Sequence, residues 1–235
     1  MKAFITGASL GIGKAVAEAL AAEGFALVLN ARNPERLMDF GKKLTEKHPA
    51  IHCDCLAADL TDPKERSALT QSILSRHKKL DVVVNNAGVF ETGDSLQDPG
   101  VFEKAVDLHL KAPYYLVVDL SSLLRDSDSA HVINIASVQS KTPNTQSPAY
   151  SVSKYALRGL SANMREVFKK DGIKVTNVMP GYTWSNSWKG AEIPRERLME
   201  PEDIARVVVC ALTLGKSAVM EEVVLRPQLG EFPDE

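Results

Sequence analysis

Seven short apolar runs recur along the chain, and stretches with helical periodicity separate them. The runs are AFIT, ALVLN, IHCDCLA, DVVVNNAG, HVINIAS, IKVTNVMPG and VMEEVVLRP. Strands that alternate with helices form a parallel sheet, because each connection must cross back over the sheet. Several runs are apolar almost throughout, which is typical of strands covered by helices on both faces. The sequence therefore predicts a doubly wound α/β fold with about seven parallel strands.

The segments between these runs carry helix signals. Ile12, Val16 and Leu20 form one apolar stripe after the first run. A second helix is predicted over residues 34–47, with Asn33 as its N-cap, because a proline then occupies the first helical position. Both patterns agree with alternating strands and helices.

No Gly/Ser linker, charge block or internal repeat divides the 235 residues. We therefore expect residues 1–235 to form one domain, which is large enough to bury a substantial core. Residues 181–200 lack clear periodicity between two confident elements. Long ordered loops are often lids or binding loops, so this segment is predicted to lie on the substrate side.

Composition narrows the classes of partner. With 44% hydrophobic and 25% charged residues and a net charge of -2, the chain shows no electrostatic attraction to nucleic acid or anionic membranes. Its apolar runs are too short for a membrane span or a signal peptide, so a cytoplasmic protein is expected. Three cysteines at these spacings do not indicate a zinc site, and no metal is expected.

A glycine-rich turn follows the first apolar run. TGASLGIGKAVAEAL places Gly7, Gly11 and Gly13 between a strand and a helix, where the backbone can approach a pyrophosphate bound at the helix N-terminus. The spacing departs from G-x-G-x-x-G, and a merely tight turn would also explain the glycines. Their position in the first strand-to-helix turn of a parallel fold favours a nucleotide site.

The second strand ends in LVLNARNPERL, with Ala31 and Arg32 at its end. An acidic residue there would accept the ribose hydroxyls of NAD, whereas an arginine can pair with the extra phosphate of NADP. The alternative is an exposed surface arginine. Its place at the adenosine end of the expected site predicts NADP(H) in preference to NAD(H).

Tyr150 and Lys154 stand four residues apart in SPAYSVSKYALRG, at the start of an expected helix. Neighbours at this spacing are common on solvated helix faces and stabilise one another slightly. The chemical alternative is that the ammonium favours the phenolate and brings the pKa of the phenol toward a working range. The pair alone does not decide between them.

Four motifs together resemble the short-chain dehydrogenase/reductase family. They are TGxxxGxG at residues 6–13, NNAG at 85–88, Ser137, and the pair Tyr150 and Lys154. The resemblance is to the family's single-domain type, covers essentially the whole chain and follows the family's motif order. It implies a Rossmann-like fold and an oxidoreductase that uses a nicotinamide cofactor.

The resemblance also implies roles for these side chains. Ser137 would hydrogen-bond the substrate oxygen, Tyr150 would act as the general acid or base, and Lys154 would hold the nicotinamide ribose and lower the pKa of the tyrosine. A hydride added to a carbonyl carbon leaves an alkoxide, so a tuned proton donor and a second hydrogen-bond donor are required. Ser137 follows HVINIA at a strand end, where doubly wound sheets place their sites.

The expected cofactor contacts extend along the chain. The resemblance places Asp59 at the adenine amine and Asn86 to Gly88 along the adenosine ribose, although Asn86 is equally suited to tying adjacent strands together. The full expected set is Gly7, Ser9, Leu10, Gly11, Ile12, Gly13, Arg32, Asp59, Leu60, Asn86, Ala87, Gly88, Tyr150, Lys154, Pro180, Gly181 and Thr183.

One position departs from the family's pattern. DLHLKAPYYL places His109 where the family usually has an asparagine that completes a catalytic tetrad, thought to hold a relay water largely through its main-chain carbonyl. Pro113 lacks an N–H and cannot bond the carbonyl four residues earlier, which belongs to residue 109. We therefore expect His109 to serve in the tetrad; the alternative is a packed residue in a protein with a broken relay.

The substrate pocket is less clearly marked. Candidates to line it are Val138, Gln146, Tyr182, Trp184 and Trp188, with Gln139 beside them. Aromatic residues on a loop suit an apolar or ring-shaped carbonyl compound. The tryptophans would equally serve to cover core or an oligomer contact.

The favoured function is an NADP(H)-dependent oxidoreductase acting on a carbonyl or a secondary alcohol. The alternative is a protein of the same fold that binds the cofactor as a sensor or interaction platform without turnover, which only His109 favours. An epimerase or dehydratase of the family's longer type would need a separate substrate domain. The resemblance implies a homodimer or homotetramer, with contacts near residues 99–125 and 148–170.

Overall fold

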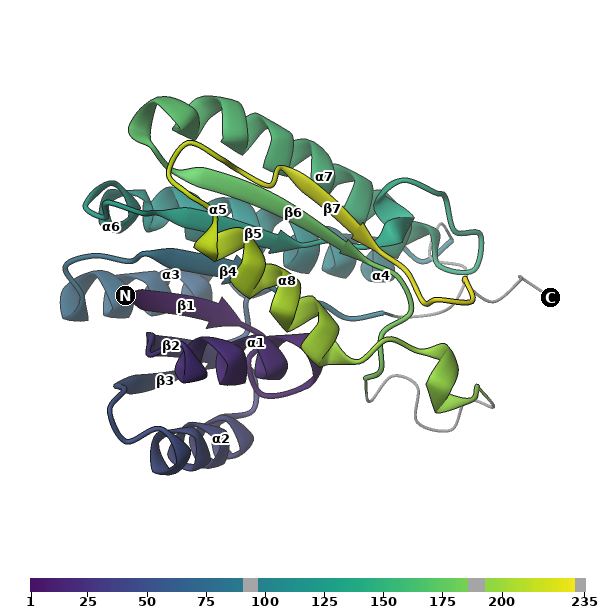
Figure 1. Cartoon of the computed structure of the whole chain (residues 1–235). Helices are drawn as coiled ribbons and strands as arrows, with labels where there is room; N and C mark the ends of the chain where they lie inside the picture. The colour runs from purple at the N-terminus through teal and green to yellow at the C-terminus, as the bar shows by residue number, and fades with distance from the viewer. Residues whose placement is uncertain (91–96, 186–192, 231–235) are drawn as a thin grey trace.

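The computed structural model describes residues 1–90, 97–185 and 193–230. Seven strands of this part form one sheet in which every neighbouring pair is parallel, as the apolar runs predict. They are β1 (Lys2–Thr6), β2 (Ala26–Ala31), β3 (Cys53–Ala57), β4 (Val82–Asn85), β5 (His131–Ile135), β6 (Lys174–Pro180) and β7 (Glu222–Leu225). Figure 1 shows their arrows pointing to one edge of the sheet.

The strand order is β3-β2-β1-β4-β5-β6-β7. The chain builds outward from β1 in one direction and then continues on its other side, where Ile5 of β1 lies beside Val84 of β4. Such a reversal opens a crevice at the carboxyl ends of the two central strands, where doubly wound sheets bind their ligands. A functional site is therefore expected at this edge of the sheet.

Helices cover both faces of the sheet. They are α1 (Gly11–Ala22), α2 (Pro34–Lys47), α3 (Pro63–Arg76), α4 (Pro99–Val106), α5 (Ala112–Asp119), α6 (Ser121–Arg125), α7 (Pro148–Phe168) and α8 (Pro201–Thr213). Buried residues of α1, α2 and α8 pack on one face, and those of α3, α5, α6 and α7 on the other. None of these described helices is long and apolar enough to cross a membrane.

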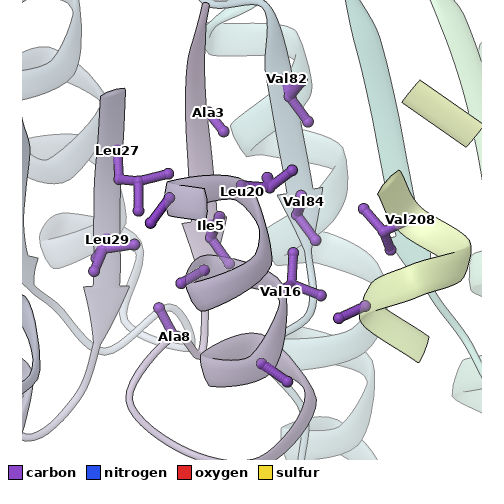
Figure 2. Packing of buried hydrophobic residues seen from close by; sticks show 14 of the residues in the cluster. Ala3, Ile5, Ala8, Val16, Leu20, Leu27, Leu29, Val82, Val84 and Val208 are labelled. Carbon is purple, nitrogen blue, oxygen red and sulfur yellow. The ribbon is translucent and has the colours of Figure 1, made fainter. Parts of the chain in front are cut away.

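Local signals explain where the helices begin. The α2 helix has the predicted bounds, 34–47, and the Asn33 side chain accepts a hydrogen bond of 2.8 Å from the Arg36 N–H. The apolar stripe predicted for α1 faces the sheet through Val16 and Leu20, which are fully buried. Figure 2 shows these two residues packed over the central strands.

The core between α1, α8 and the sheet is built mainly from aliphatic side chains. Figure 2 labels Ala3, Ile5, Ala8, Val16, Leu20, Leu27, Leu29, Val82, Val84 and Val208 in this cluster. The strand residues are apolar on this face, and alternate residues such as Phe4, Val28 and Val83 pack on the opposite face. Burial on both faces explains why the strand sequences are nearly uniformly apolar.

Buried polar side chains fasten α7 to the sheet. The Asn85 amide donates to the Asn134 side-chain oxygen at 2.8 Å, and the Asn134 amide donates to the Ser161 hydroxyl at 2.8 Å. Ser161 lies on α7 and also donates to the Leu157 carbonyl. These bonds join α7 at Ser161 to the neighbouring strands β4 and β5.

Candidate active site

A cleft of about 1090 Å³ follows the carboxyl ends of the strands. Its walls come from the segments after β1 to β6 and from the first turns of α2 and α7. The glycine turn and Arg32 lie toward one end, whereas Ser137, Tyr150 and Lys154 belong to segments on the other side of the sheet reversal. Residues separated widely in the sequence thus share one cavity.

The glycine turn is shaped by two residues that adopt the left-handed backbone region. Gly7 has a φ of +64° and Gly11 a φ of +54°, which side chains with a Cβ rarely adopt. A Cβ on Gly11 would meet nothing closer than the Ser185 Cβ at 3.9 Å, so it would project into open space of the cleft. The N-cap residue of α1 is Leu10, which offers no side-chain acceptor to the first N–H groups of the helix.

Asn86 links the glycine turn to the end of β4. Its amide nitrogen donates to the Thr6 carbonyl at 2.9 Å and to the Gly7 carbonyl at 3.3 Å, while the Thr6 hydroxyl accepts from the Asn86 backbone at 2.9 Å. Asn86 also lines the cleft. Asn86 can therefore tie adjacent strands together and also contact a ligand in the cleft.

Gly13 packs beneath the turn, and it does not line the cleft. A Cβ at this position would lie 2.3 Å from the Asn86 side-chain nitrogen and 2.4 Å from the Gly7 carbonyl oxygen. Real Cβ atoms do not approach so closely, so this glycine permits helix α1 to meet the turn.

Two arginines stand at the end of the cleft formed by β2 and α2. Arg32 and Arg36 both line it, together with Asn33. Nearby, burial disfavours ionisation of Asp59, but hydrogen bonds from Thr61 and the charge of Arg32 outweigh it and hold the pKa of Asp59 below its ordinary value. Asp59 itself does not line the cleft, because its carboxylate is turned to the Thr61 N–H and hydroxyl at 2.9 and 2.8 Å.

Charge along the cleft is of one sign. Among the described residues that line it, the charged side chains are Arg32, Arg36 and Lys154, and none is acidic. A cavity with glycine-rich backbone at a helix N-terminus, whose charged side chains are all cationic, is suited to a phosphate-bearing ligand.

Ser137, Tyr150 and Lys154 meet at the end of β5. The Ser137 hydroxyl hydrogen-bonds the phenol of Tyr150. The Lys154 ammonium donates to the Ile135 carbonyl at 2.9 Å and lies 5.5 Å from the centre of the Tyr150 ring. All three residues line the cleft.

Burial dominates the pKa values at this end. Burial raises the pKa of Tyr150 to about 12, opposed by its hydrogen bond to Ser137, and the lowering of this pKa by Lys154 that the family resemblance implies stays a prediction. Burial also lowers the pKa of Lys154 to about 7. The phenol therefore stays protonated at neutral pH.

The Tyr150 ring is held between two other rings. Phe90 meets it edge-on with centroids 5.1 Å apart, and His109 does the same at 5.3 Å. Phe90 lines the cleft, whereas His109 lies behind Tyr150 and does not. The tyrosine therefore has defined neighbours on two sides.

His109 belongs to a π-helical turn, η1 (Asp107–Lys111), that joins α4 to α5. The Ala112 N–H bonds the Asp107 carbonyl five residues earlier. Pro113 follows four residues after His109 and five after Leu108, and without an N–H it can serve neither carbonyl. Single π turns inside helices occur frequently at functional sites. The water-holding role expected for the residue 109 carbonyl stays a prediction.

The substrate side is described in part. Val138, Gln146, Tyr182 and Trp184 line the cleft, and Trp188 lies outside the described residues. Within the predicted loop 181–200, the Trp184 N–H donates to the Met199 carbonyl at 2.8 Å, and the Met199 N–H donates to the Tyr182 carbonyl at 3.0 Å. Arg195 stacks over the Trp184 ring at 4.3 Å. The two described ends of this loop are thus fastened together.

Comparisons with known proteins agree with this geometry. The family model described as short chain dehydrogenase matches residues 1–194, which is more than half of the chain. The chain belongs to the short-chain dehydrogenase family. A sepiapterin reductase from Chlorobaculum tepidum is 32% identical to it, with 98% of each chain covered. The protein is an oxidoreductase of this family with a Rossmann-like fold.

Solved structures of this family resemble the whole chain. A metagenomic short-chain oxidoreductase in complex with NADP is 31% identical, covers 97% of each chain and has a TM-score of 0.84. The L-sorbose reductase from Gluconobacter frateurii, complexed with NADPH and L-sorbose, is 27% identical, covers 96% of this chain and 95% of its own, and has a TM-score of 0.88.

Most of the expected site residues of this short-chain dehydrogenase line one cleft. The expected cofactor contacts that do so are Gly7, Ser9, Leu10, Gly11, Ile12, Arg32, Leu60, Asn86, Ala87, Gly88, Tyr150, Lys154, Pro180, Gly181 and Thr183. Gly13, Asp59 and His109 do not line it.

The sequence reasoning missed Arg36 and Phe90. A signal for Arg36 was present, because it follows the Asn33 N-cap by three residues and so lies in the first turn of α2 beside Arg32. Phe90 follows the NNAG motif by two residues, and only the fold shows that its ring meets Tyr150.

Proposed function

We propose that this protein is an NADPH-dependent reductase that converts a neutral carbonyl compound to the alcohol. The observation that carries the proposal is the hydrogen-bonded pair of Ser137 and Tyr150, which shares one cleft with the glycine turn and two arginines. A site of this kind can bind a dinucleotide and deliver a proton to an oxygen at its far end.

The cleft fits a dinucleotide cofactor by shape and charge. Gly11 leaves open the space that a Cβ would fill at the N-terminus of α1, and no described acidic side chain lines the cavity. A pyrophosphate would be held by the N–H groups of the first turn of α1. A reduced nicotinamide supplies a hydride to a carbonyl carbon when it is bound in such a site.

Arg32 and Arg36 support NADP(H) over NAD(H). Two guanidinium groups at the β2 end of the cleft suit the additional phosphate of NADP, whereas an acidic residue at position 32 would repel it. The NADP and NADPH complexes of two related structures point the same way.

The residues of this chain supply the proton chemistry. Because burial raises the pKa of Tyr150 to about 12, its phenol is protonated at neutral pH and can donate to an oxygen on which negative charge develops. Ser137 hydrogen-bonds the phenol and supplies a second hydroxyl to orient that oxygen. Lys154, whose ammonium donates to the Ile135 carbonyl, would bind the ribose hydroxyls beside the nicotinamide.

The described pocket suits a neutral substrate with both apolar and hydrogen-bonding surface. Aromatic side chains of Phe90, Tyr182 and Trp184 and the carboxamides of Gln139 and Gln146 line it. Such a wall combines stacking surface with amide donors and acceptors. The related proteins named as reductases of sepiapterin and L-sorbose suggest heterocyclic ketones and ketoses as the compounds to test.

The decisive assay follows NADPH absorbance with a panel of sugar ketones, pterin side-chain ketones, α-diketones, quinones and aldehydes. We expect turnover of at least one class by the wild-type protein. Tyr150→Phe should bind NADPH with unchanged affinity, measured by nucleotide fluorescence, and lose turnover by roughly a thousandfold or more. Ser137→Ala should lose turnover while keeping nucleotide binding.

Three outcomes would contradict the proposal. Tight NADPH binding without turnover across the panel would favour a cofactor sensor of the same fold. Undiminished activity of Tyr150→Phe would remove the proton donor from its assigned role. Tighter binding of NADH than of NADPH would overturn the cofactor preference.

We also infer that the chain forms homo-oligomers through α5 and α7. Tyr114, Tyr115 and Val118 on α5 and Val152 and Tyr155 on α7 are large apolar side chains with more than a third of their surface exposed. Light scattering should give a mass of two or four chains, and Tyr115→Glu with Tyr155→Glu should yield monomers.

A further inference from the structure

His109 takes part in a closed set of contacts around Tyr150. The Val89 N–H donates to His109 Nε2 at 3.1 Å, and His109 Nδ1 lies 2.9 Å from the Ser153 hydroxyl oxygen. That hydroxyl donates to the Tyr150 carbonyl at 2.7 Å. Phe90, next to Val89, meets the Tyr150 ring from the cleft side.

The hydrogen-bond directions in this set allow one arrangement. A backbone N–H can only donate, so His109 Nε2 must accept and carries no proton. The Ser153 hydroxyl gives its proton to the Tyr150 carbonyl and therefore accepts from His109 Nδ1–H. The imidazole is neutral, with its proton on Nδ1.

The surroundings keep the imidazole neutral. His109 is 1% exposed and Ser153 is fully buried. Burial, followed by the positive charge of Lys154, holds the pKa of His109 well below its ordinary value. The imidazole is therefore uncharged at neutral pH and is unsuited to donating a proton to Tyr150.

We call the contacts from Val89 through His109 and Ser153 to the Tyr150 carbonyl the bridge. It joins segments that must move together for Tyr150 to stay in place. Val89 and Phe90 follow β4, His109 lies in η1, and Ser153 stands three residues after Tyr150 on α7. One contact orients the ring and another holds the backbone carbonyl of the same residue.

We propose that His109 is a positioning residue that fixes Tyr150 through the chain Val89, His109, Ser153 and the Tyr150 carbonyl. The proposal rests on the proposed reductase function and assigns to the imidazole a task that is separate from any use of the residue 109 carbonyl. A proton donor held in one orientation reacts faster than one that samples several, because orientation is part of the barrier.

Each half of the bridge can be removed by itself. In His109→Asn, the amide nitrogen takes the place of Nδ1 and can reach Ser153, but nothing replaces Nε2 at the Val89 N–H. In His109→Gln, the longer side chain can accept from Val89 and leaves Ser153 without a donor. Ser153→Ala removes the link to the Tyr150 carbonyl and keeps the histidine.

The matched control is Ser161→Ala. Ser161 is another buried serine of α7, and it donates to a carbonyl of the same helix as Ser153 does, but it lies more than two turns beyond Tyr150. It should lose thermal stability to a similar extent. We expect kcat for ketone reduction to fall roughly 10- to 100-fold in His109→Asn, His109→Gln and Ser153→Ala, with KM for NADPH within about twofold.

The control separates positioning from stability. If Ser153→Ala and the His109 variants lose stability as Ser161→Ala does but keep wild-type kcat, the proposal is overturned. A rise in kcat by orders of magnitude in His109→Asn would overturn it too, and would also contradict the idea that the residue 109 carbonyl serves regardless of side chain.

A second measurement does not depend on activity. Two-bond ¹H–¹⁵N correlation spectra of the wild-type protein should show His109 as the Nδ1–H tautomer from pH 5.5 to 8, and the Nδ1–H signal should shift in Ser153→Ala. An Nε2–H tautomer, or protonation within this range, would overturn the bridge. If the spectra agree and no carbonyl compound is reduced, the proposed function fails while the bridge stands.

Discussion

The ammonium nitrogen of Lys154 lies 2.9 Å from the carbonyl oxygen of Ile135, and the lysine is buried in the wall of the cleft. Burial lowers its pKa from an ordinary value of 10.5 to about 7. The unfolded chain therefore binds more protons than the folded chain between pH 7 and 10.5. Stability should rise with pH through this window, because the unfolded state loses the protons that favour it.

Lys154→Met tests this cost of burial. The variant keeps an unbranched side chain of similar length, removes the buried ammonium and should raise Tm at pH 7 by about 5 °C, or about 2 kcal/mol in a chain of this size. The gain should shrink toward pH 10. Thermal unfolding at pH 7, 8.5 and 10 measures it, with Lys14→Met on an exposed face of α1 as the control. If the Tm of Lys154→Met changed with pH as that of the wild type does, Lys154 would not be the source of the pH dependence.

The fold was readable from the sequence where its causes are local. Apolar runs locate the strands because burial on both faces excludes polar residues, and Asn33 with its following proline locates the start of α2 because capping needs only adjacent residues. The last strand is shorter than its apolar run, VMEEVVLRP, because only Glu222–Leu225 pairs with β6.

The site was less completely readable, because its electrostatics depend on three-dimensional surroundings. The spacing of Tyr150 and Lys154 is compatible with a lowered phenol pKa, whereas burial of both groups sets the opposite direction. His109 binds Ser153 from 44 positions away, and no local pattern marks that pair. Similarly, the Thr61 N–H and hydroxyl both bond one carboxylate oxygen of Asp59, a residue that the family pattern assigns to a ligand.

Gly13→Ala should destabilise the protein and weaken nucleotide binding. The added Cβ would overlap the Asn86 amide and the Gly7 carbonyl, so the glycine turn must shift. We expect a loss of about 1–3 kcal/mol in unfolding free energy and at least a tenfold rise in the Kd for NADPH. Chemical denaturation and fluorescence titration measure the two effects.

Gly159→Ala is the matched control for that substitution. Gly159 lies within α7, and a Cβ there would meet nothing within 4 Å. Alanine should therefore stabilise the helix by about 0.5–1 kcal/mol. Equal effects of the two substitutions would show that crowding at Gly13 does not matter.

Arg32→Ala should raise the KM for NADPH roughly 10- to 100-fold and change the KM for NADH by less than about threefold, because only NADPH carries the phosphate that the guanidinium would bind. Arg36→Ala should act in the same direction. Steady-state kinetics with both cofactors provide the comparison. Arg206→Ala, an exposed arginine of α8 that does not line the cleft, is the control. Parallel losses with NADH and NADPH would argue against phosphate recognition.

Acid should destabilise the protein through buried histidines. Burial, with a smaller contribution from the charge of Lys174, lowers the pKa of His131 to about 3, and its Nε2 lies 2.7 Å from the Thr176 hydroxyl. As pH falls, this histidine is protonated in the unfolded chain before it is protonated in the folded chain. Proton binding therefore favours the unfolded state, and stability falls as pH drops below about 6.5. At pH 5.5 this contributes about 1 kcal/mol of destabilisation.

His131→Asn should therefore be less stable than the wild type at pH 7.5, because the contact with Thr176 is lost, but should lose less further stability on going to pH 5.5. Urea unfolding at both pH values gives the two differences. His48→Asn, at the C-terminal end of α2, keeps the buried histidine and should retain the wild-type slope. An unchanged slope in His131→Asn would show that His131 does not carry the acid sensitivity.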